Sequence, residues 1–477
     1  MQAPFSPYLD SISEGIHTLV DLLLQEFDDV SILCTDSQGF SIRISRQINS
    51  ITRKTMTTER GIVARVWKDG LYSEVAFNEF DPDAPEITAR HITDVLHEQF
   101  GLIRSLPLEI YETGRLPDEP RTLRIEMGTE RLPEHEDLQA LVDQMTDIVR
   151  NGLTMDEHLV DCMLSAQSTH VCKMFISPNR DLRQSYVYSE GNASCVGALD
   201  GRMEASYDGV SGRKGPEIFS VLPEKMVHAL HTVQELLTSD RIEPGEYDVI
   251  TSPEVTGLIA HEAFGHGVEM DMFVKGRALG AEYLGKRVGS DLVSMHEGAL
   301  CAEDVTSYAF DDEGIMAGDV TEIDHGILRT GICDALSALR LGVQPTGNGK
   351  RENFEHKVYT RMTNTIFDSG TSTFEEMLAS IKHGYYLCGM HSGMEDPKHW
   401  GIQCIVERGY EIQDGQLTGK VVSPVVLTGY VPDLLSSISM VSQDREVFGT
   451  GGCGKGHKEW VKVADGGPYL KAKARLG

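Results

Sequence analysis

The chain has 477 residues, of which 40% are hydrophobic and 24% charged, and a formal net charge of −30. These values are typical of a soluble globular protein with two large domains, and so acidic a chain is not expected to bind nucleic acid or anionic membranes. The sequence has no run of 18 apolar residues and no leader pattern at its start, so we expect a cytoplasmic protein without a membrane span.

The first 240 residues alternate between strand and helix patterns. A hairpin is predicted around Asp69-Gly70, and glycine turns separate the strands predicted over 185–210. Another turn is predicted at 37–39, where Ser-Gln-Gly interrupts an alternating segment. Apolar residues at helical spacing predict amphipathic helices over about 12–27, 84–102, 133–149 and 224–237.

The pattern changes after Gly245, where glycine becomes frequent and short strands and turns dominate. Only the segments 253–266 and 373–382 have a clear helical pattern. We therefore predict an α+β fold, in which an N-terminal mixed α/β region (1–220) is followed by a β-rich C-terminal domain (221–477) with a short metal-binding helix. The nine cysteines are irregularly spaced without a Cys-x-x-Cys pair, which argues against a disulfide framework.

One short predicted helix carries residues suited to hydrolysis. The segment 252–267 begins with Ser-Pro, a typical N-cap and first turn, and ends with Gly, a typical stop. His261, Glu262 and His266 fall in its last turns. Neutral imidazoles bind zinc without cancelling its charge, and a carboxylate beside the zinc-bound water can take its proton. This combination is typical of a metallohydrolase.

The spacing His-Glu-x-x-x-His is one residue longer than the common zinc-peptidase motif. On a regular α-helix, residues five apart point about 140° away from each other, so His261 and His266 could not share one ion. A π-type turn would bring both onto one face, and Gly265 would ease that distortion. We therefore predict an irregular helix between the two histidines.

Spacing alone does not select a third metal ligand. Cys453 lies in a glycine-rich run, FGTGGCGKGHKEW, which would expose its thiol and let it ionise beside zinc. A buried small residue in a tight turn is nevertheless the commoner role of a lone cysteine. The residues that could complete the site are Glu269, Asp271, His296, His391, His399, Cys453 and His457.

At this point the sequence resembles a known family. HEAFGHGVEMD (261–271) is similar to the HExxxH segment of the TldD subunits of the TldD/PmbA metallopeptidases. The resemblance covers about residues 30–475, and KHWGIQC (398–404) departs from it where many relatives carry a Gly-Asp-Phe type of segment. The other matching segments, in chain order, are RGIVARVWKDGLYSEVAF, VYSEGN, FDDEG, PTGNGKRENF, RMTNTIFDSG and CGKG…DGGPYL.

The resemblance implies a zinc-dependent peptidase that hydrolyses unfolded or extended peptides. His261, His266 and Cys453 match the family's zinc ligands, and Glu262 matches its general base, which acts on a metal-activated water. The resemblance also implies a homodimer or a heterodimer with a TldE/PmbA-like paralogue, with the N-terminal region serving dimerisation and enclosing a cavity. Because that paralogue lacks the HExxxH segment, this chain is expected to be the catalytic, TldD-like type.

Three other interpretations stay open. A non-catalytic peptide-binding or partner subunit would hold a structural metal with four protein ligands. The segment 449–456 has the spacing of a phosphate loop, but its last residue is Gly and no helix is predicted after it. Asp311, Asp312 and Glu313 do not fit an EF-hand calcium loop, and we expect an exposed acidic turn there.

Overall fold

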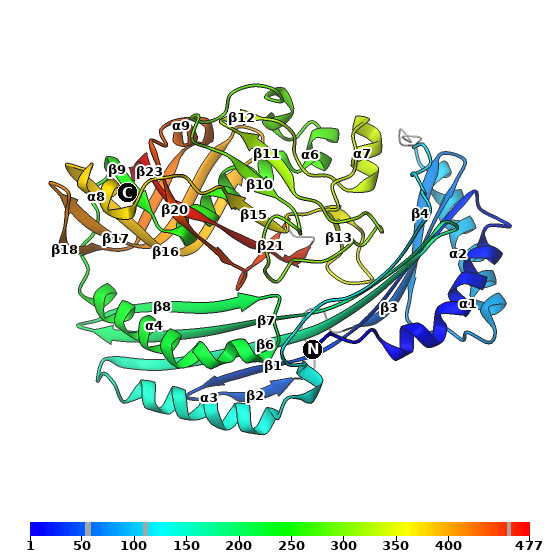
Figure 1. Cartoon of the computed structure of the whole chain (residues 1–477), viewed down its shortest axis with the longest axis horizontal. Helices are drawn as coiled ribbons and strands as arrows, with labels where there is room; N and C mark the ends of the chain where they lie inside the picture. The colour runs from blue at the N-terminus through cyan, green and yellow to red at the C-terminus, as the bar shows by residue number, and fades with distance from the viewer. Residues whose placement is uncertain (53–58, 108–112, 456–458) are drawn as a thin grey trace.

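The computed structural model describes residues 1–52, 59–107, 113–455 and 459–477, and two large sheets dominate them (Figure 1). The strands of the first sheet lie before residue 213, and those of the second lie after residue 244. This arrangement confirms the predicted α+β fold with a β-rich C-terminal region. None of the helices within these ranges is long and apolar enough to cross a membrane.

The first sheet has the strand order β4-β3-β1-β6-β7-β5, with β2 beside β1 and β8 beside β7. The pair β5–β7 is parallel and the other pairs are antiparallel. Long strands with alternating burial let one face carry helices while the other meets the second sheet. The strands are β1 (Asp29–Ser45), β2 (Asn49–Thr52), β3 (Arg60–Lys68), β4 (Leu71–Phe77), β5 (Arg121–Glu126), β6 (Leu159–Ile176), β7 (Arg180–Leu199) and β8 (Arg202–Gly212).

Four helices cover the first sheet through two apolar clusters (Figure 1). Helices α1 and α2 pack on β1, β3 and β6 at one end, and α3 and α4 pack on β1, β6 and β7 at the other. The four helices predicted in this half are therefore confirmed, with their ends displaced by a few residues. They are α1 (Pro7–Leu23), α2 (Pro85–Ser105), α3 (Leu138–Leu153) and α4 (Leu222–Leu237), with the short turns η1 (Pro133–His135) and η2 (Pro216–Val221).

The second sheet has eleven strands, five of which close on themselves. The last strand, β23, pairs with β9 and β19, while β9 pairs with β16, β16 with β17, and β17 with β19. The strands are β9 (Gly245–Thr251), β10 (Met295–Glu297), β11 (Val320–Asp324), β12 (Ile327–Leu328), β15 (Asn364–Phe367), β16 (His383–Asp396), β17 (Gly401–Gln413), β18 (Gln416–Val422), β19 (Val425–Tyr430), β20 (Met440–Phe448) and β23 (Ala464–Leu476). Two small ribbons lie apart from it, β13 (Gly349–Lys350) with β14 (Tyr359–Thr360), and β21 (Gly452–Gly454) with β22 (Trp460–Lys462).

Short helices connect the strands of this half. Those predicted within 253–266 and 373–382 are confirmed, but α6, α7 and α9 were not predicted, because five to seven residues are too few for a helical period to stand out. The helical segments of this half are α5 (Pro253–Leu258), η3 (Ile259–Gly265), η4 (His266–Val268), α6 (Met270–Val274), η5 (Leu279–Glu282), α7 (Ala335–Leu341), α8 (Phe374–Ala379) and α9 (Val431–Ser436).

One of the two predicted turns near the N-terminus is wrong. The hairpin at Asp69-Gly70 is confirmed, since β3 and β4 pair on either side of it and both residues have positive φ. The turn at 37–39 does not exist, because β1 runs through this segment and pairs there with β6. Gly39 serves a close approach of two strands instead: a Cβ on it would lie 2.2 Å from the carbonyl oxygen of Ser168.

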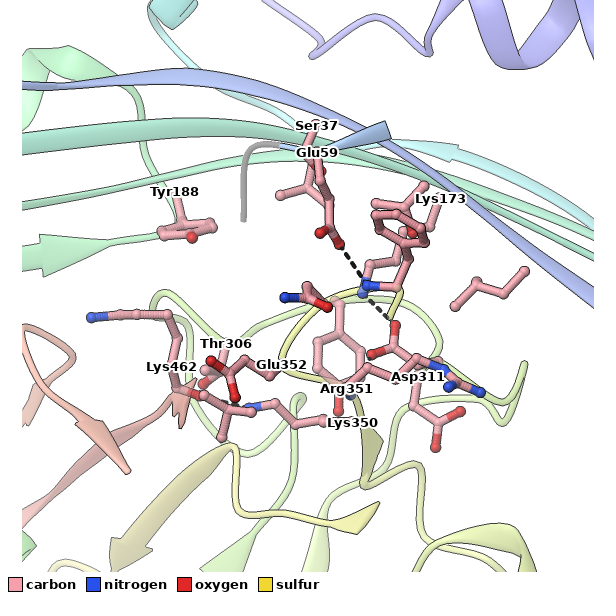
Figure 2. Close-up of a pocket in the computed structure, with 18 of the residues that line it drawn as sticks. Ser37, Glu59, Lys173, Tyr188, Thr306, Asp311, Lys350, Arg351, Glu352 and Lys462 are labelled. Atoms are coloured by element: carbon pink, nitrogen blue, oxygen red, sulfur yellow. Dashed lines mark hydrogen bonds and ion pairs between the residues drawn. The ribbon is translucent and has the colours of Figure 1, made fainter. Parts of the chain in front are cut away.

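Buried ion pairs join the first sheet to a loop of the second half. Lys173 of β6 pairs with Asp312 beside a cavity of about 90 Å³, into which Figure 2 looks. Arg65 of β3 pairs with Glu313. Asp311 accepts hydrogen bonds from three backbone amides. The expectation of an exposed acidic turn at 311–313 is therefore wrong: the three residues are 2–6% exposed, because they form the contact between the two halves.

Candidate metal centre

The helix that carries the histidines is irregular where the sequence predicted it to be. Helix α5 begins at Pro253, where the Ser252 hydroxyl accepts a hydrogen bond from the amide of Val255. It continues as the π-helix η3, in which the amide of His266 donates to the carbonyl of His261, five residues back. The prediction of a π-type turn is therefore confirmed. One wider turn places side chains that are five residues apart on the same side of the helix.

Gly265 has a further reason to be glycine. A Cβ at this position would lie 2.2 Å from the Sδ atom of Met362. The π-helix therefore packs against β15 and the residues just before it more closely than a side chain would allow. The expectation from sequence was only that glycine would ease the distortion of the helix. The packing requirement depends on a residue almost one hundred positions away and could not be read from the motif.

The structure brings His261, His266 and Cys453 together. One potential ligand atom from each lies within 4.8 Å of the others, and Cys453 Sγ is 3.3 Å from His266 Nε2. His261 and Cys453 are buried, and His266 is 16% exposed through its side chain. In the described part of the chain this is the one group of three such residues close enough to share an ion.

The other candidates for a third ligand lie elsewhere. His296 is held between Asp319 and Asp368, and His399 bonds to Asp396. His391 lines a second cavity, of about 1050 Å³, beside the three residues, and its ring lies against that of Tyr207. Glu269 and Asp271 lie behind His266, as described below. His457 lies outside the described residues.

Cys453 is placed by the ribbon of β21 and β22, where it pairs with Val461. Burial alone would raise the pKa of the Cys453 thiol, but the imidazoles of His261 and His266 lower it well below its usual value. In turn, despite burial, the thiolate raises the pKa of His261 to about 8 and that of His266 well above its ordinary range. Without an ion these three groups share protons, and a cation among them would replace those protons.

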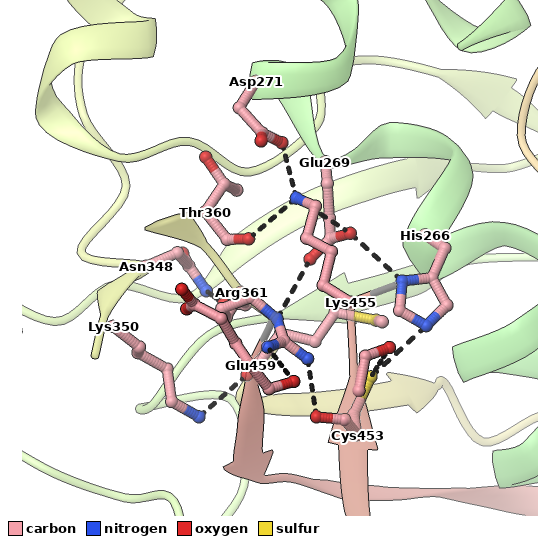
Figure 3. Close-up of polar contacts among 12 residues, drawn as sticks. His266, Glu269, Asp271, Asn348, Lys350, Thr360, Arg361, Cys453, Lys455 and Glu459 are labelled. Carbon is pink, nitrogen blue, oxygen red and sulfur yellow. Dashed lines mark hydrogen bonds and ion pairs between the residues drawn. The ribbon is translucent and has the colours of Figure 1, made fainter. Parts of the chain in front are cut away.

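A carboxylate fixes the ring of His266 from behind (Figure 3). Glu269 Oε2 lies 3.0 Å from His266 Nδ1, which leaves Nε2 for the side that faces Cys453. Lys455 Nζ lies 3.3 Å from the same carboxylate oxygen and donates to Asp271 Oδ1 at 2.6 Å. Although Glu269 is fully buried, Lys455, His266 and Arg361 hold its pKa at about 2, so it is ionised. Such a carboxylate behind a histidine sets its tautomer and orientation.

Arg361 connects the two parts of the site (Figure 3). Its side chain is completely buried, with Nε 3.7 Å from Glu269 Oε1. Its Nη2 donates to the backbone carbonyl of Cys453 at 2.8 Å, and its Nη1 to that of Glu459 at 3.4 Å. One guanidinium therefore holds the carboxylate behind His266 and the ribbon that carries Cys453, although these two residues are 187 positions apart.

His261 has a looser carboxylate neighbour. Asp465 Oδ2, at the start of β23, lies 3.9 Å from His261 Nδ1, and this nitrogen has no hydrogen-bond partner among the described residues. Burial raises the pKa of Asp465 to about 7. Gly257 makes room for this side chain, since a Cβ there would lie 2.5 Å from Asp465 Oδ1. Sequence reasoning missed Arg361 and Asp465, whose only signal is a charged residue in an otherwise buried segment.

The centre opens into a cavity of about 1050 Å³. Residues of both halves line it, including Glu190 and Tyr207 from the first sheet and His391 and Glu395 from β16. Glu262 lies in the wall of the same cavity, and Gly393 of β16 packs directly on it: a Cβ at Gly393 would lie 2.4 Å from Glu262 Cγ. The predicted base and the predicted ligands therefore face one space large enough for a peptide segment.

The donor set fits a metal of intermediate softness. Two imidazoles and a thiolate are ligands that zinc takes, and these three residues would hold such an ion. All three line the cavity, whereas a purely structural site would use a fourth protein ligand. No fourth histidine or cysteine joins the group within the residues described.

Comparisons with known proteins show that the chain is similar to metallopeptidases. Residues 244–473 match the model of the PmbA/TldA metallopeptidase C-terminal domain. A metalloprotease of Methanocaldococcus jannaschii is 31% identical over 59% of this chain and 62% of its own length, and a metalloprotease of Synechocystis is 28% identical over 71% and 72%. A metalloprotease of Methanothermobacter thermautotrophicus is 31% identical over 50% of this chain. The chain matches 62% of the length of the Methanocaldococcus jannaschii relative and 51% of the length of the Methanothermobacter thermautotrophicus relative.

Solved structures share the whole fold at low sequence identity. TldE from Thermococcus kodakarensis superposes with a TM-score of 0.76 at 17% identity, covering 97% of this chain and 99% of its own. A protein of Thermotoga maritima described as a putative modulator of DNA gyrase gives 0.75 at 19% identity, covering 98% and 100%. The matching domain, the relatives and the fold agree with the resemblance to the TldD/PmbA metallopeptidases seen in the sequence.

Proposed function

We propose that this chain is a catalytic zinc peptidase in which His261, His266 and Cys453 hold the metal and Glu262 is the general base. The observation that carries the proposal is the convergence of two imidazoles and a thiol within 4.8 Å beside a cavity that also contains Glu262. The naming of the relatives as metalloproteases supports the same activity.

The chain's own groups have separate tasks in hydrolysis. A bound zinc ion supplies a Lewis acid that activates water and polarises the scissile carbonyl. The Glu262 carboxylate accepts a proton from the attacking water and then gives it to the amide nitrogen of the leaving group. Glu269 and Asp465 keep the two imidazoles oriented, and Arg361 holds the backbone of Cys453 in place beside them.

The substrate is proposed to be an unfolded or extended peptide that adds a strand to β16. Within the described residues, β16 pairs with β17 along its whole length but with β9 only over Gly384–Leu387. The free edge is the segment 391–396, which lines the metal cavity and includes Gly393 beside Glu262. Backbone hydrogen bonds along such an edge give affinity with little dependence on side chains.

The assembly and the domain roles are also proposals. The fold shared with TldE supports a dimer, either of two copies or with a TldE/PmbA-like paralogue. The N-terminal region (1–220) is proposed to serve dimerisation and to enclose the cavity, while 221–477 carries the chemistry. Because α4 packs on β7 and β8 of the first sheet, we favour a domain boundary after Leu237.

The test is the substitution Glu262→Gln, which keeps the shape of the side chain and removes its basicity. Purified protein loaded with zinc is incubated with an unfolded, fluorescently labelled peptide, and metal content is measured in parallel. We expect Glu262→Gln to retain the metal and to lose activity by about a thousandfold or more. Normal cleavage by this variant would favour the alternative, a non-catalytic peptide-binding or partner subunit with a structural metal.

A further inference from the structure

We infer that the metal cavity selects peptides with a lysine or arginine close to the cleaved bond, and that Glu395 recognises this cation. The inference rests on the proposed peptidase function and names its substrate class. The observations behind it are the acidic groups of the cavity wall, the lack of a hydrogen-bond partner for the Glu395 carboxyl group and the position of Glu395 along β16.

The wall of the cavity has an excess of negative charge. Five carboxylates and two lysines line it. Lys462 pairs with Glu190 and Lys455 with Glu269. Glu262, Glu395 and Asp465 have no lysine or arginine partner in the described part of the chain. The wall therefore has more carboxyl groups than lysines, and three of these carboxyl groups have no lysine or arginine of the described residues beside them.

Glu395 is the least compensated of these carboxylates. Both of its oxygens are buried, and neither has a hydrogen-bond partner among the described residues. A buried carboxylate without a partner is costly, and a cation brought by a ligand would relieve that cost.

Strand β16 places Glu395 at a fixed distance from the proposed base. Gly393 packs on Glu262, and the pairing with β17 is regular from Gly393 to Asp396. Because side chains alternate along a strand, Gly393 and Glu395 face the same side, about 7 Å apart. On that side Glu395 also reaches η4, the helical turn that carries His266, since a Cβ at Gly267 would lie 2.5 Å from Glu395 Oε1.

A peptide strand on the free edge of β16 would present every second side chain to this same side. A lysine or arginine there would stand opposite or diagonal to Glu395, as a cross-strand pair of opposite charge. Because the cleaved bond lies over Glu262, this cation belongs within about two residues of that bond. Glu395 is thus assigned as a specificity-determining residue, distinct from the metal ligands and the base.

The experiment compares extended peptides of one sequence that carry lysine, norleucine or glutamate at each position near the cleaved bond. Cleavage is measured with the zinc-loaded enzyme, and affinity is measured by fluorescence anisotropy in a Glu262→Gln background, where peptides stay intact. The variants are Glu395→Gln and, as a matched control, Asp396→Asn, which removes a carboxylate from the next residue. Asp396 is exposed and bonds to His399 instead of facing the helix.

We expect the lysine peptide to exceed the glutamate peptide by about tenfold in both kcat/KM and affinity. The ratio should fall close to one in Glu395→Gln, stay unchanged in Asp396→Asn, and invert in Glu395→Lys. Equal use of all peptides by wild type, or a lysine preference that persists in Glu395→Gln, would overturn the inference. Cation-selective binding without any cleavage would keep the inference and contradict the peptidase function, so the two failures are distinguishable.

Discussion

The first sheet and the surroundings of the proposed metal centre are stabilised in different ways. In the first sheet, long strands and four amphipathic helices bury two large apolar clusters. Around the proposed metal centre, charged side chains such as Glu269 (1% exposed), Arg361 (0%) and Asp465 (6%) are buried together. Apolar packing distributes stability over many contacts, whereas a buried charge depends on a few partners. Single substitutions should therefore have different consequences in the two regions.

The largest effect is expected at Cys453. Cys453→Ala removes the thiolate from the three-residue group, so zinc affinity should fall by more than about a hundredfold, measured by competition with a chromophoric chelator. Cys404→Ala is the matched control, because Cys404 is also buried but belongs to the apolar core of the second sheet. Equal zinc affinity in the two variants would exclude Cys453 as a ligand.

The next effect is expected at Arg361, which is neither one of the three proposed metal ligands nor a residue that lines the cavity. Arg361→Met frees the Cys453 ribbon from Glu269, so zinc affinity should fall by about ten- to a hundredfold. Cobalt substitution adds a spectroscopic measurement, since a displaced thiolate weakens the sulfur-to-cobalt charge-transfer band. Arg361→Lys should restore only part of the affinity, because an ammonium cannot span both partners. An unchanged band in Arg361→Met would show that Arg361 does not position Cys453.

Arg65 provides the contrast to Arg361. It is also a buried arginine, but it pairs with Glu74 on the neighbouring strand β4 and joins the two halves through Glu313, and it does not support the metal group. Arg65→Met leaves buried carboxylates without their cation, so the free energy of unfolding should fall by about 3 kcal/mol in denaturant titrations. Zinc affinity of the folded variant should match wild type. A loss of zinc affinity as large as that of Arg361→Met would remove the distinction between the two regions.

The smallest effect concerns His170 in the first sheet. Its ring lies between Glu134 and Ser185, and although burial opposes this, Cys172 and Glu134 raise the pKa of His170 to about 10. A raised histidine pKa stabilises the fold fully below the unfolded value of about 6.5, and the contribution is lost as the pH rises through 10. Between pH 6.5 and 10, wild type should therefore lose stability that His170→Gln does not lose. Parallel stability curves for the two proteins would contradict the raised pKa.

The contrast between the regions also explains what the sequence could predict. Helical periods and the Asp69-Gly70 hairpin are local signals, so the elements of the first half were predicted closely. The π-helix followed from the spacing of His261 and His266, which is local as well. The prediction of a turn at 37–39 was wrong, because Gly39 is needed for the close contact with the backbone of Ser168 on a neighbouring strand.

Long-range charge contacts leave no local pattern. The exposed turn expected at 311–313 failed because those acidic residues meet Arg65 and Lys173 from the other half. Arg361 and Asp465 support histidines about one to two hundred residues away, and no spacing rule connects them. Cys453 was selected by resemblance to a family and not by its spacing, since six other residues were open at that stage.

The most direct measurement is zinc K-edge X-ray absorption of the purified, zinc-loaded protein. The account predicts one zinc per chain with two imidazole nitrogens at about 2.0 Å and one sulfur at about 2.3 Å, and loss of the sulfur shell in Cys453→Ala. A first shell without sulfur, or a sulfur shell that persists in Cys453→Ala, would contradict the proposed metal centre.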